Sequence, residues 1–349
     1  MATIKELAKC CGVSVATVSN ILNNKPGASE KTRKLVLEMA EQLNYTPNIV
    51  AKNLKMQKTR SIGVIAEDMT IFSIPDIIDG ITEYCQSQEY QILLTNLRLF
   101  KKYNDTYYNK EDYYGLVRQE IKKLMEKQVE GIIYVAAHER VIRCIPDDLP
   151  IPAVMAYGYS KSSRIPSVVV NDIGGAAKIV RHILDHGHRN VGVITGKPDS
   201  LHAQARLVGY QQVLFQNKIL YDPGLVAEGD WTRKSGYRCA SELIEKGVSA
   251  IFAMNDLMAG GVYDRVEELK RTIGSEISVA GYDDRELSGY YHPPLTTVSL
   301  PLHDIGYKAS EWLIELLGGR ELEQGEENVC ALDCTLLVRK SVKDITHSL

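Results

Sequence analysis

Three polar side chains and one tryptophan in the second half of the chain have the chemistry to hold a ring that carries hydroxyl groups. Arg206 offers a bidentate guanidinium donor, Asn255 an amide and Asp283 a carboxylate, while Trp231 offers a flat apolar face. Planar polar groups suit neighbouring hydroxyls, and an aromatic plate suits the C–H face of a sugar. The residues therefore predict a small-molecule site, for which a sugar or sugar phosphate is the expected ligand.

Each of these residues also has an ordinary structural role that the sequence leaves open. Arg206 could pair with an acid inside the fold, and Trp231 could be a core residue. Asn255 could cap the helix that follows it, and Asp283 could belong to a turn. Their placement near the ends of predicted strands favours one common site over four unrelated roles.

The chain offers little support for enzyme or metal chemistry. It contains no GxSxG, HExxH or P-loop motif, and the adjacent carboxylates of Asp283 and Asp284 are expected to point apart. The histidine-rich segment 185–189 falls where a helix passes into a strand, which favours a structural role. The seven cysteines lack zinc spacing and are expected to be reduced. We therefore expect no catalytic residue, no metal ligand and no cofactor.

From residue 61 onward, short apolar runs alternate with amphipathic helical stretches. This alternation predicts parallel sheets with right-handed crossovers, and because it restarts near residue 167 we expect two doubly wound lobes facing each other. The first lobe should span about 61–158 and 294–322, the second about 159–293 and 323–340, and a tail should follow at 341–349. Ligands bind at the carboxyl ends of strands in such sheets, which places the candidate site in the cleft between the lobes.

Residues 1–46 have the pattern of three short helices around one small core. Thr3 and Glu6 form a capping box, Gly12 ends the first helix, and Ser14 caps the second. A short turn with a glycine between two helices is the helix-turn-helix layout. This pattern predicts an all-α head, although an isolated helical hairpin at a domain edge would have the same features.

The outer face of the second helix carries only small residues, which would let the helix come close to base edges. Val15 and Ala16 could contact thymine methyl groups, Asn20 could pair with an adenine edge, and Thr17 and Ser19 could bind phosphates. Residues 1–60 hold ten Lys and Arg against four acids, a net charge of +6 that leaves −9 for the remainder. A basic head on an acidic body favours a polyanionic partner for the head.

The segment 47–60 should link the head to the body. Residues 48–54 could form two helical turns after Pro47, with Val50 and Leu54 on one face. Such a helix is too short to be stable alone and needs DNA, a second copy, or both. Apolar side chains of this kind can wedge between base steps in the minor groove.

The segments ATIKELAKCCGVSVATVSNILN and YTPNIVAKNLKMQKTRSIGVI resemble the head and hinge of the LacI/GalR family of bacterial transcription regulators. The resemblance places Val15, Ala16 and Asn20 at base-reading positions, and Leu54 in the minor groove with Lys55 beside it. The full set of expected DNA contacts is Thr3, Ser14, Val15, Ala16, Thr17, Ser19, Asn20, Asn24, Asn48, Ala51, Leu54 and Lys55.

The body is similar to the type I periplasmic-binding-protein-like domain of the same family. The resemblance places Arg206, Trp231, Asn255 and Asp283 at effector-contact positions. It adds Asp172, from an Asn–Asp pair in reversed order, and Phe72 and Ile74, near the usual contact loop of the first lobe. A tyrosine-rich stretch at residues 101–114 departs from the family pattern.

These features together predict a cytoplasmic, sequence-specific DNA-binding regulator, a repressor, whose operator affinity responds to a small molecule in the cleft. Two chains would read the half-sites of a pseudo-palindromic operator, so we expect a homodimer. A purine-type or phosphocarrier corepressor is the alternative effector, and a solute-binding receptor is the alternative class. No run of about 18 apolar residues and no secretory signal is present, so no membrane partner is expected.

Overall fold

The computed structural model describes residues 2–22, 24–45, 59–320 and 328–346. The chain divides into two compact units, the head (Met1–Arg60) and the body (Ser61–Leu349). The expected contacts Asn48, Ala51, Leu54 and Lys55 lie outside the described residues, as does most of the predicted linker.

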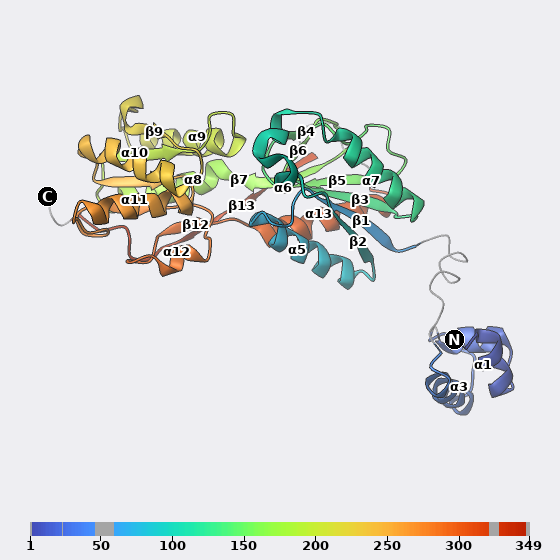
Figure 1. Cartoon of the computed structure of the whole chain (residues 1–349). Coiled ribbons are helices and arrows are strands. Elements are labelled where there is room, and N and C mark those ends of the chain that lie inside the picture. Colours follow the sequence, from blue (N-terminus) through green and yellow to red (C-terminus); the bar gives the residue numbers. More distant parts are fainter. Residues whose placement is uncertain (1, 23, 46–58, 321–327, 347–349) are drawn as a thin grey trace. The chain divides into compact units, whose positions relative to one another are not determined.

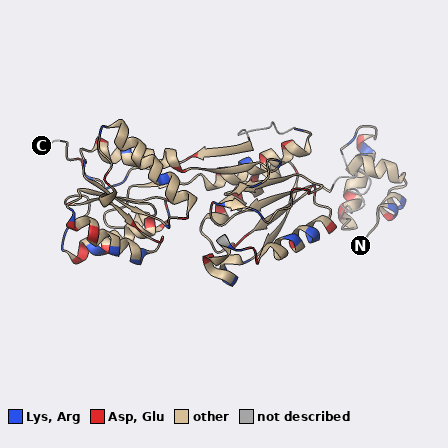
Figure 2. Ribbon diagram, turned by 90° about the horizontal axis from the view of Figure 1, so that it is seen from above, with Lys and Arg blue, Asp and Glu red and all other residues tan. Residues whose placement is uncertain are grey.

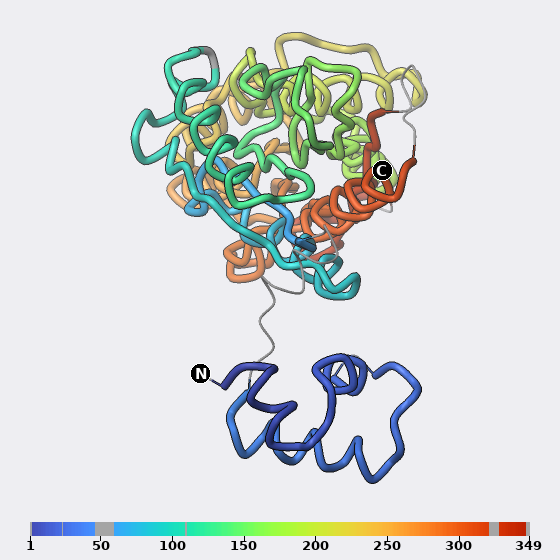
Figure 3. Tube along the Cα trace, turned by 90° about the vertical axis from the view of Figure 1, so that its right-hand side faces the viewer, coloured from blue at the N-terminus to red at the C-terminus, as the bar shows by residue number. Residues whose placement is uncertain are grey.

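The described part of the head is a bundle of helices α1 (Ile4–Cys11), α2 (Val15–Leu22) and α3 (Glu30–Gln42), traced in blue in Figure 3. The capping box is confirmed, since the Thr3 N–H donates to Glu6 Oε2 at 2.7 Å and the Glu6 N–H donates to Thr3 Oγ1 at 3.3 Å. Gly12 ends α1 with a φ of +65°. Leu7, Val18 and Val36, one from each helix, are fully buried and form the centre of the bundle.

The first lobe of the body is a parallel sheet in the order β13-β7-β5-β3-β1-β2. Its strands are β1 (Ser61–Ala66), β2 (Gln91–Asn96), β3 (Gly131–Val135), β5 (Ala153–Ala156), β7 (Ser167–Asn171) and β13 (Val329–Asp333). Its helical segments are α5 (Ser73–Ser87), α6 (Leu99–Tyr103), η1 (Asn104–Asn109), α7 (Tyr114–Glu126) and α13 (Leu302–Leu317). A short parallel pair, β4 (Val141–Ile142) with β6 (Tyr159–Ser160), completes this lobe.

The second lobe is a parallel sheet in the order β11-β10-β8-β9. Its strands are β8 (Val191–Thr195), β9 (Val226–Glu228), β10 (Ala250–Ala253) and β11 (Ser278–Ala280). Its helical segments are α8 (Asp172–Asp185), α9 (Leu201–Gln216), η2 (Pro223–Leu225), α10 (Arg233–Glu245), α11 (Asp256–Glu268) and α12 (Leu287–Tyr290). An antiparallel pair, β12 (Thr297–Ser299) with β14 (Thr335–Leu337), lies where the chain passes between the lobes (Figure 1).

The expected architecture of a helical head with two doubly wound lobes is confirmed, but the predicted lobe boundary is wrong for two strands. The restart at residue 167 placed β7 in the second lobe, whereas β7 pairs with β5 and β13 in the first sheet. The segment 323–340, predicted as part of the second lobe, contains β13, which joins the first sheet, and β14, which pairs with β12. The chain therefore leaves the first lobe after β7, at the junction of Asn171 and Asp172.

The central strands are apolar enough to be buried on both faces. Strands β1, β3, β5, β8 and β10 carry no charged residue, and the charged residues of the body lie mainly on its helices and loops (Figure 2). Such runs are typical of parallel sheets covered by helices on both sides. Among the described helices, none has the length and apolar character needed to cross a bilayer.

Candidate functional site

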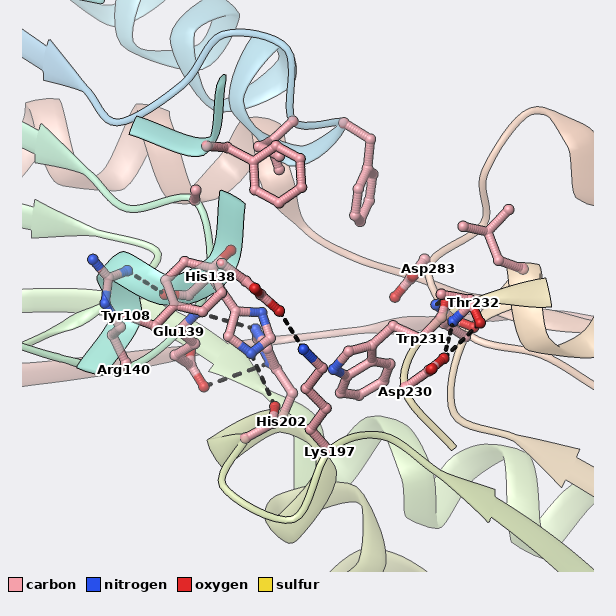
Figure 4. A pocket seen from close by; sticks show the side chains of 18 of the residues that line it. Tyr108, His138, Glu139, Arg140, Lys197, His202, Asp230, Trp231, Thr232 and Asp283 are labelled. Atoms are coloured by element: carbon pink, nitrogen blue, oxygen red, sulfur yellow. Dashed lines mark hydrogen bonds and ion pairs between the residues drawn. The ribbon is translucent and has the colours of Figure 1, made fainter. Parts of the chain in front are cut away.

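A cavity of about 680 Å³ opens between the two lobes, bounded by loops that follow the parallel strands. The first lobe contributes residues 70–72 after β1 and 137–140 after β3. The second contributes residues 197–200 after β8, 230–232 after β9, Asn255 after β10, and Asp283 and Arg285 after β11. This is the expected position for a ligand in doubly wound sheets. In Figure 4, Tyr108 and Arg140 lie on one side of the cavity and Trp231, Thr232 and Asp283 on the other.

Arg206 lines the cavity and also forms the internal ion pair that the sequence left open. Its side chain is only 3% exposed, and its Nε donates to Asp172 Oδ1 at 2.7 Å. Its Nη1 lies 3.4 Å from Asp283 Oδ1 and donates to the Met254 carbonyl, while its guanidinium stacks on the Tyr282 ring at 3.7 Å. The guanidinium is therefore fixed in place before any ligand arrives.

Asp172 forms an ion pair with Arg206 but is not among the residues that line the cavity. Burial opposes the ionisation of its carboxyl, but Arg206 and His202 outweigh burial and hold the pKa of Asp172 below its usual value. Asp172 begins α8 directly after β7, so the crossover between the lobes positions this carboxylate. We therefore correct the expected effector contact at Asp172 to a positioning role.

Asp283 presents a second carboxylate at the cavity wall. Its backbone has a φ of +103°, which is rare outside glycine and turns the residue back toward Arg206. Burial raises the pKa of Asp283 to about 6, although Arg206 acts in the opposite direction. Arg206 and Asp283 thus place a donor and an acceptor side by side.

Trp231 and Asn255 form a linked pair at the same wall. The Asn255 Nδ2 donates to the Trp231 carbonyl at 3.0 Å, and its Oδ1 accepts from the Met258 N–H at 2.8 Å, so Asn255 does cap α11. The indole ring fits against Gly196, where an added Cβ would come 1.9 Å from Trp231 Cζ2. Trp231 and Asn255 therefore both line the cavity and both stabilise the fold around it.

Of the two effector contacts expected from the first lobe, Phe72 lines the cavity and Ile74 does not. Phe72 lines the cavity and is 38% exposed, and the Arg285 guanidinium lies 4.9 Å from its ring. The prediction for Ile74 is wrong, because Ile74 is fully buried in the core and does not line the cavity. It lies in the first turn of α5, whose apolar face packs on the sheet.

The sequence reasoning missed a group of first-lobe residues that complete the cavity. Tyr108 stacks on His138 with ring centroids 5.3 Å apart, and the Arg140 guanidinium lies 4.9 Å from the Tyr108 ring. Arg140 is held by the buried Glu67, with an Nη2–Oε1 distance of 2.6 Å. The tyrosine-rich stretch, noted as a departure from the family pattern, is therefore part of the wall. Residues 138–140 come soon after β3, and this position at the carboxyl end of a strand could have identified them from the sequence.

Several contacts join the lobes across the cavity, among them the hydrogen bond between His138 Nε2 and Ser200 Oγ at 3.0 Å. Lys197 of the second lobe forms an ion pair with Asp105 of the first. His202 Nδ1, from the second lobe, lies 3.7 Å from Glu139 Oε2, and the Glu139 N–H donates to His202 Nε2 at 3.3 Å. These contacts lie at the cavity and connect the two lobes there.

Glu139, Asp172 and His202 bring potential metal-binding atoms within 4.8 Å of one another. Both oxygens of Asp172 already accept hydrogen bonds, one from Arg206 Nε and one from His202 Nδ1. A dication would have to displace His202 and would lie beside the Arg206 guanidinium, so the cluster fits a charge-balanced hydrogen-bond network better than a metal centre.

The expected DNA-reading surface lies on α2. Val15, Ala16 and Asn20 are exposed, and Ser19 is half-buried. The Thr17 N–H donates to the Ser14 hydroxyl at 3.1 Å, so Ser14 caps the helix as predicted. Thr3 is exposed but is engaged in its capping box, and the Asn24 side chain accepts from Arg33 Nη1 at 3.0 Å.

Comparisons with known proteins agree with this geometry. Residues 3–48 match the model of bacterial regulatory proteins of the lacI family, and residues 180–342 match the periplasmic binding protein-like domain. Among curated proteins, the chain is 30% identical over 349 residues to the HTH-type transcriptional repressor PurR of Vibrio parahaemolyticus serotype O3:K6 (strain RIMD 2210633), covering 99% of this chain and 100% of that protein. The repressor PurR of Vibrio atlanticus (strain LGP32) is 31% identical over the same shares.

Solved structures agree in fold. The Lac repressor dimer bound to operator and the anti-inducer ONPF superposes with a TM-score of 0.74 and 26% identity, covering 98% of this chain and 99% of that one. The complex of the regulator CelR with cellobiose has a TM-score of 0.63 at 23% identity, covering 98% of this chain and 100% of that one, which supports the fold alone. With a matching head, a matching body and a full-length relative at 30% identity, the chain belongs to the LacI family of bacterial regulatory proteins.

Proposed function

We propose that this DNA-binding repressor acts as a homodimer on a pseudo-palindromic operator and responds to a sugar or sugar phosphate in the interlobe cavity. The observation that carries the ligand class is the pair Arg206 and Asp283, a fixed guanidinium and a carboxylate 3.4 Å apart beside Trp231. Such a pair can donate to one hydroxyl and accept from its neighbour, while the indole covers the C–H face of a ring. The cationic Lys197 and Arg285 at the same cavity would suit a phosphorylated sugar.

Control of DNA binding would follow from the contacts between the lobes. A ligand that favours one arrangement of Lys197 with Asp105, and of His202 with Glu139, shifts the population of lobe arrangements. The coupling to the operator cannot exceed the difference in ligand affinity between the two arrangements, typically about 1–3 kcal/mol. The head adds an electrostatic component, so operator affinity should fall steeply with salt.

A thermal-shift screen of the full chain against sugars, sugar phosphates and purines tests the ligand class. A ligand that binds only the native state raises the melting temperature in a concentration-dependent way. A sugar that stabilises the body and changes operator binding supports the proposal. Purines belong in the screen because the similar Vibrio proteins are named PurR, and a purine response without a sugar response would refute the sugar assignment.

Replacing Asp283 by asparagine should weaken binding of the active sugar about 10-fold or more. The substitution keeps the size of the side chain but removes the charge that accepts from a ligand hydroxyl, and a hydrogen bond to a charged group contributes about 1.5–3 kcal/mol. Isothermal titration of the full chain measures the change. Asp264→Asn is the control, since Asp264 is an ion-paired acid on α11 that does not line the cavity. Equal affinity in the wild type and in Asp283→Asn would disprove the assignment.

Replacing Asn20 by alanine should lower affinity for the specific operator by about 1–3 kcal/mol, because a paired amide would be lost from an adenine edge. The operator is first selected by the wild-type chain from a random duplex pool, and binding is then followed by fluorescence anisotropy at fixed salt. Binding to an unrelated duplex should be unchanged. Equal losses on both duplexes would mean that Asn20 contacts the DNA backbone and reads no base.

A further inference from the structure

A second, smaller cavity of about 320 Å³ lies in the first lobe and shares no lining residue with the interlobe cavity. It is bounded by the start of α7, by the β4–β6 pair, and by the loop that follows β4. Its lining residues are Glu111, Tyr114, Arg118, Ile142, Arg143, Ile145, Asp147, Ser160, Lys161 and Ser162. Its volume is at the lower end of the range for small-ligand pockets, which is about 300–1,000 Å³.

Three cations from three different segments face this cavity. Arg118 comes from the second turn of α7, Arg143 follows β4, and Lys161 follows β6. Within the described part of the chain, no ion pair or side-chain hydrogen bond engages any of the three. This contrasts with the interlobe cavity, where Arg140, Lys197 and Arg206 each have a carboxylate partner.

Two serine hydroxyls at the cavity can donate to a ligand. Ser160 Oγ accepts from the Ser162 N–H at 3.0 Å, and Ser162 Oγ accepts from the Arg164 N–H at 3.3 Å. Each oxygen has thus accepted a backbone hydrogen bond, while its own hydroxyl proton can still be donated to a ligand. Glu111 and Asp147 also line the cavity, which leaves one net positive charge among its ionisable side chains.

We propose that this cavity is a second ligand site, which binds a phosphoryl group either as free phosphate or as a small phosphate monoester. Guanidinium groups match phosphate oxygens in bidentate geometry, and lysine adds a point charge. The three cations and two serine hydroxyls would supply donors to the oxygens of a phosphoryl dianion, and the unpaired cations would gain an opposite charge. A neutral ligand would leave the cavity with its net positive charge.

The site is joined to the interlobe cavity through a short chain of contacts. The Tyr114 ring, which lines the second cavity, lies 5.1 Å from the Tyr113 ring, edge to face. The Tyr113 hydroxyl accepts from Arg140 Nη2 at 3.2 Å, and Arg140 lines the interlobe cavity. Three side chains, Tyr114, Tyr113 and Arg140, would therefore lie between a phosphoryl ligand and the effector.

Titration calorimetry of the full chain tests the proposal with inorganic phosphate and glycerol 3-phosphate, each at matched ionic strength in chloride. The paired substitution Arg143→Gln and Lys161→Gln should reduce phosphate affinity about 10-fold for each cation removed. Lys127→Gln is the matched control, because it removes an exposed charge at the far end of α7. All three residues are exposed, so the variants should fold normally.

The two probes also separate the two sources of the phosphoryl group. Tighter binding of glycerol 3-phosphate than of phosphate indicates a monoester, and the reverse order indicates the free anion; both support the site when the paired variant loses the response. Unchanged binding in the paired variant would overturn the proposal, because the anion would then occupy another site. Absence of any phosphate-specific heat in the wild type would overturn it as well.

Discussion

Replacing Asp172 by alanine should lower the free energy of unfolding of the body by about 3–5 kcal/mol, because a buried guanidinium would lose its main counter-charge. The Asp172 side chain is 1% exposed and that of Arg206 is 3% exposed, and their Nε–Oδ1 distance is 2.7 Å. The other carboxylate near Arg206, that of Asp283, is more distant at 3.4 Å. The substitution would also release His202, which donates to Asp172 Oδ2.

Urea unfolding followed by tryptophan fluorescence measures this effect in the intact chain. Both tryptophans, Trp231 and Trp312, lie in the body, so the signal excludes the head. Glu242→Ala is the control: Glu242 forms an exposed ion pair with Arg238 at 3.4 Å, and such pairs contribute about 0–1 kcal/mol. If Asp172→Ala cost no more than this control, Asp172 would not be the partner that makes burial of Arg206 tolerable.

The prediction of the fold depended on how clearly each element is marked in the sequence. Strands β3, β5, β8 and β10 are recognisable in the sequence, because each is a short apolar run between polar or helix-forming segments. The pairing of β7 was not predictable in this way. An apolar run shows that a strand is buried, but it carries no mark of the sheet it joins. The crossing after β7 depends on long-range contacts with β5 and β13.

The sequence predicted cavity-lining residues correctly near the carboxyl ends of strands and incorrectly where the local turn decides the direction of a side chain, while effector binding by these residues stays a prediction. Arg206, Trp231, Asn255 and Asp283 all line the cavity because the carboxyl ends of parallel strands converge. Ile74 was misplaced because it lies two residues after Phe72, at the start of a helix, and the two side chains point to opposite environments. Tyr108 reaches the cavity only through the conformation of η1, for which the sequence gives no clear pattern.

The stability of the body should fall as the pH rises from mildly acidic to mildly alkaline values, and Asp256 should be the main cause. Burial raises the pKa of Asp256 to about 8, with a smaller contribution from the charge of Asp283. In the unfolded chain the pKa of an aspartate is about 3.9. Between these two values the native state holds a proton that the unfolded chain has released, so the free energy of unfolding decreases with increasing pH.

Burial also raises the pKa of Glu139 to about 7 and that of Asp283 to about 6, and both carboxyls act in the same direction up to those values. The slope from one such group is at most about 1.4 kcal/mol per pH unit. Above pH 7, Asp256 is the remaining member of the three whose native carboxyl is still mainly protonated. From pH 7 to pH 8, Asp256 therefore contributes the most of these three carboxyls to the slope.

Replacing Asp256 by asparagine should remove about 1 kcal/mol per pH unit from the slope at its steepest, near neutral pH. An amide resembles the protonated carboxyl in shape, and its oxygen can still accept from Thr297 Oγ1 or from the Arg285 N–H, which lie 2.6 and 2.7 Å from the carboxylate oxygens. Urea unfolding by tryptophan fluorescence at several pH values gives both slopes. Asp264→Asn on the same helix should leave the slope unchanged, because Asp264 is half exposed and ion-paired with Arg233. An identical slope in the wild type and in Asp256→Asn would show that Asp256 is ionised in the native state, and that the hydrogen bonds from Thr297 and Arg285 outweigh its burial.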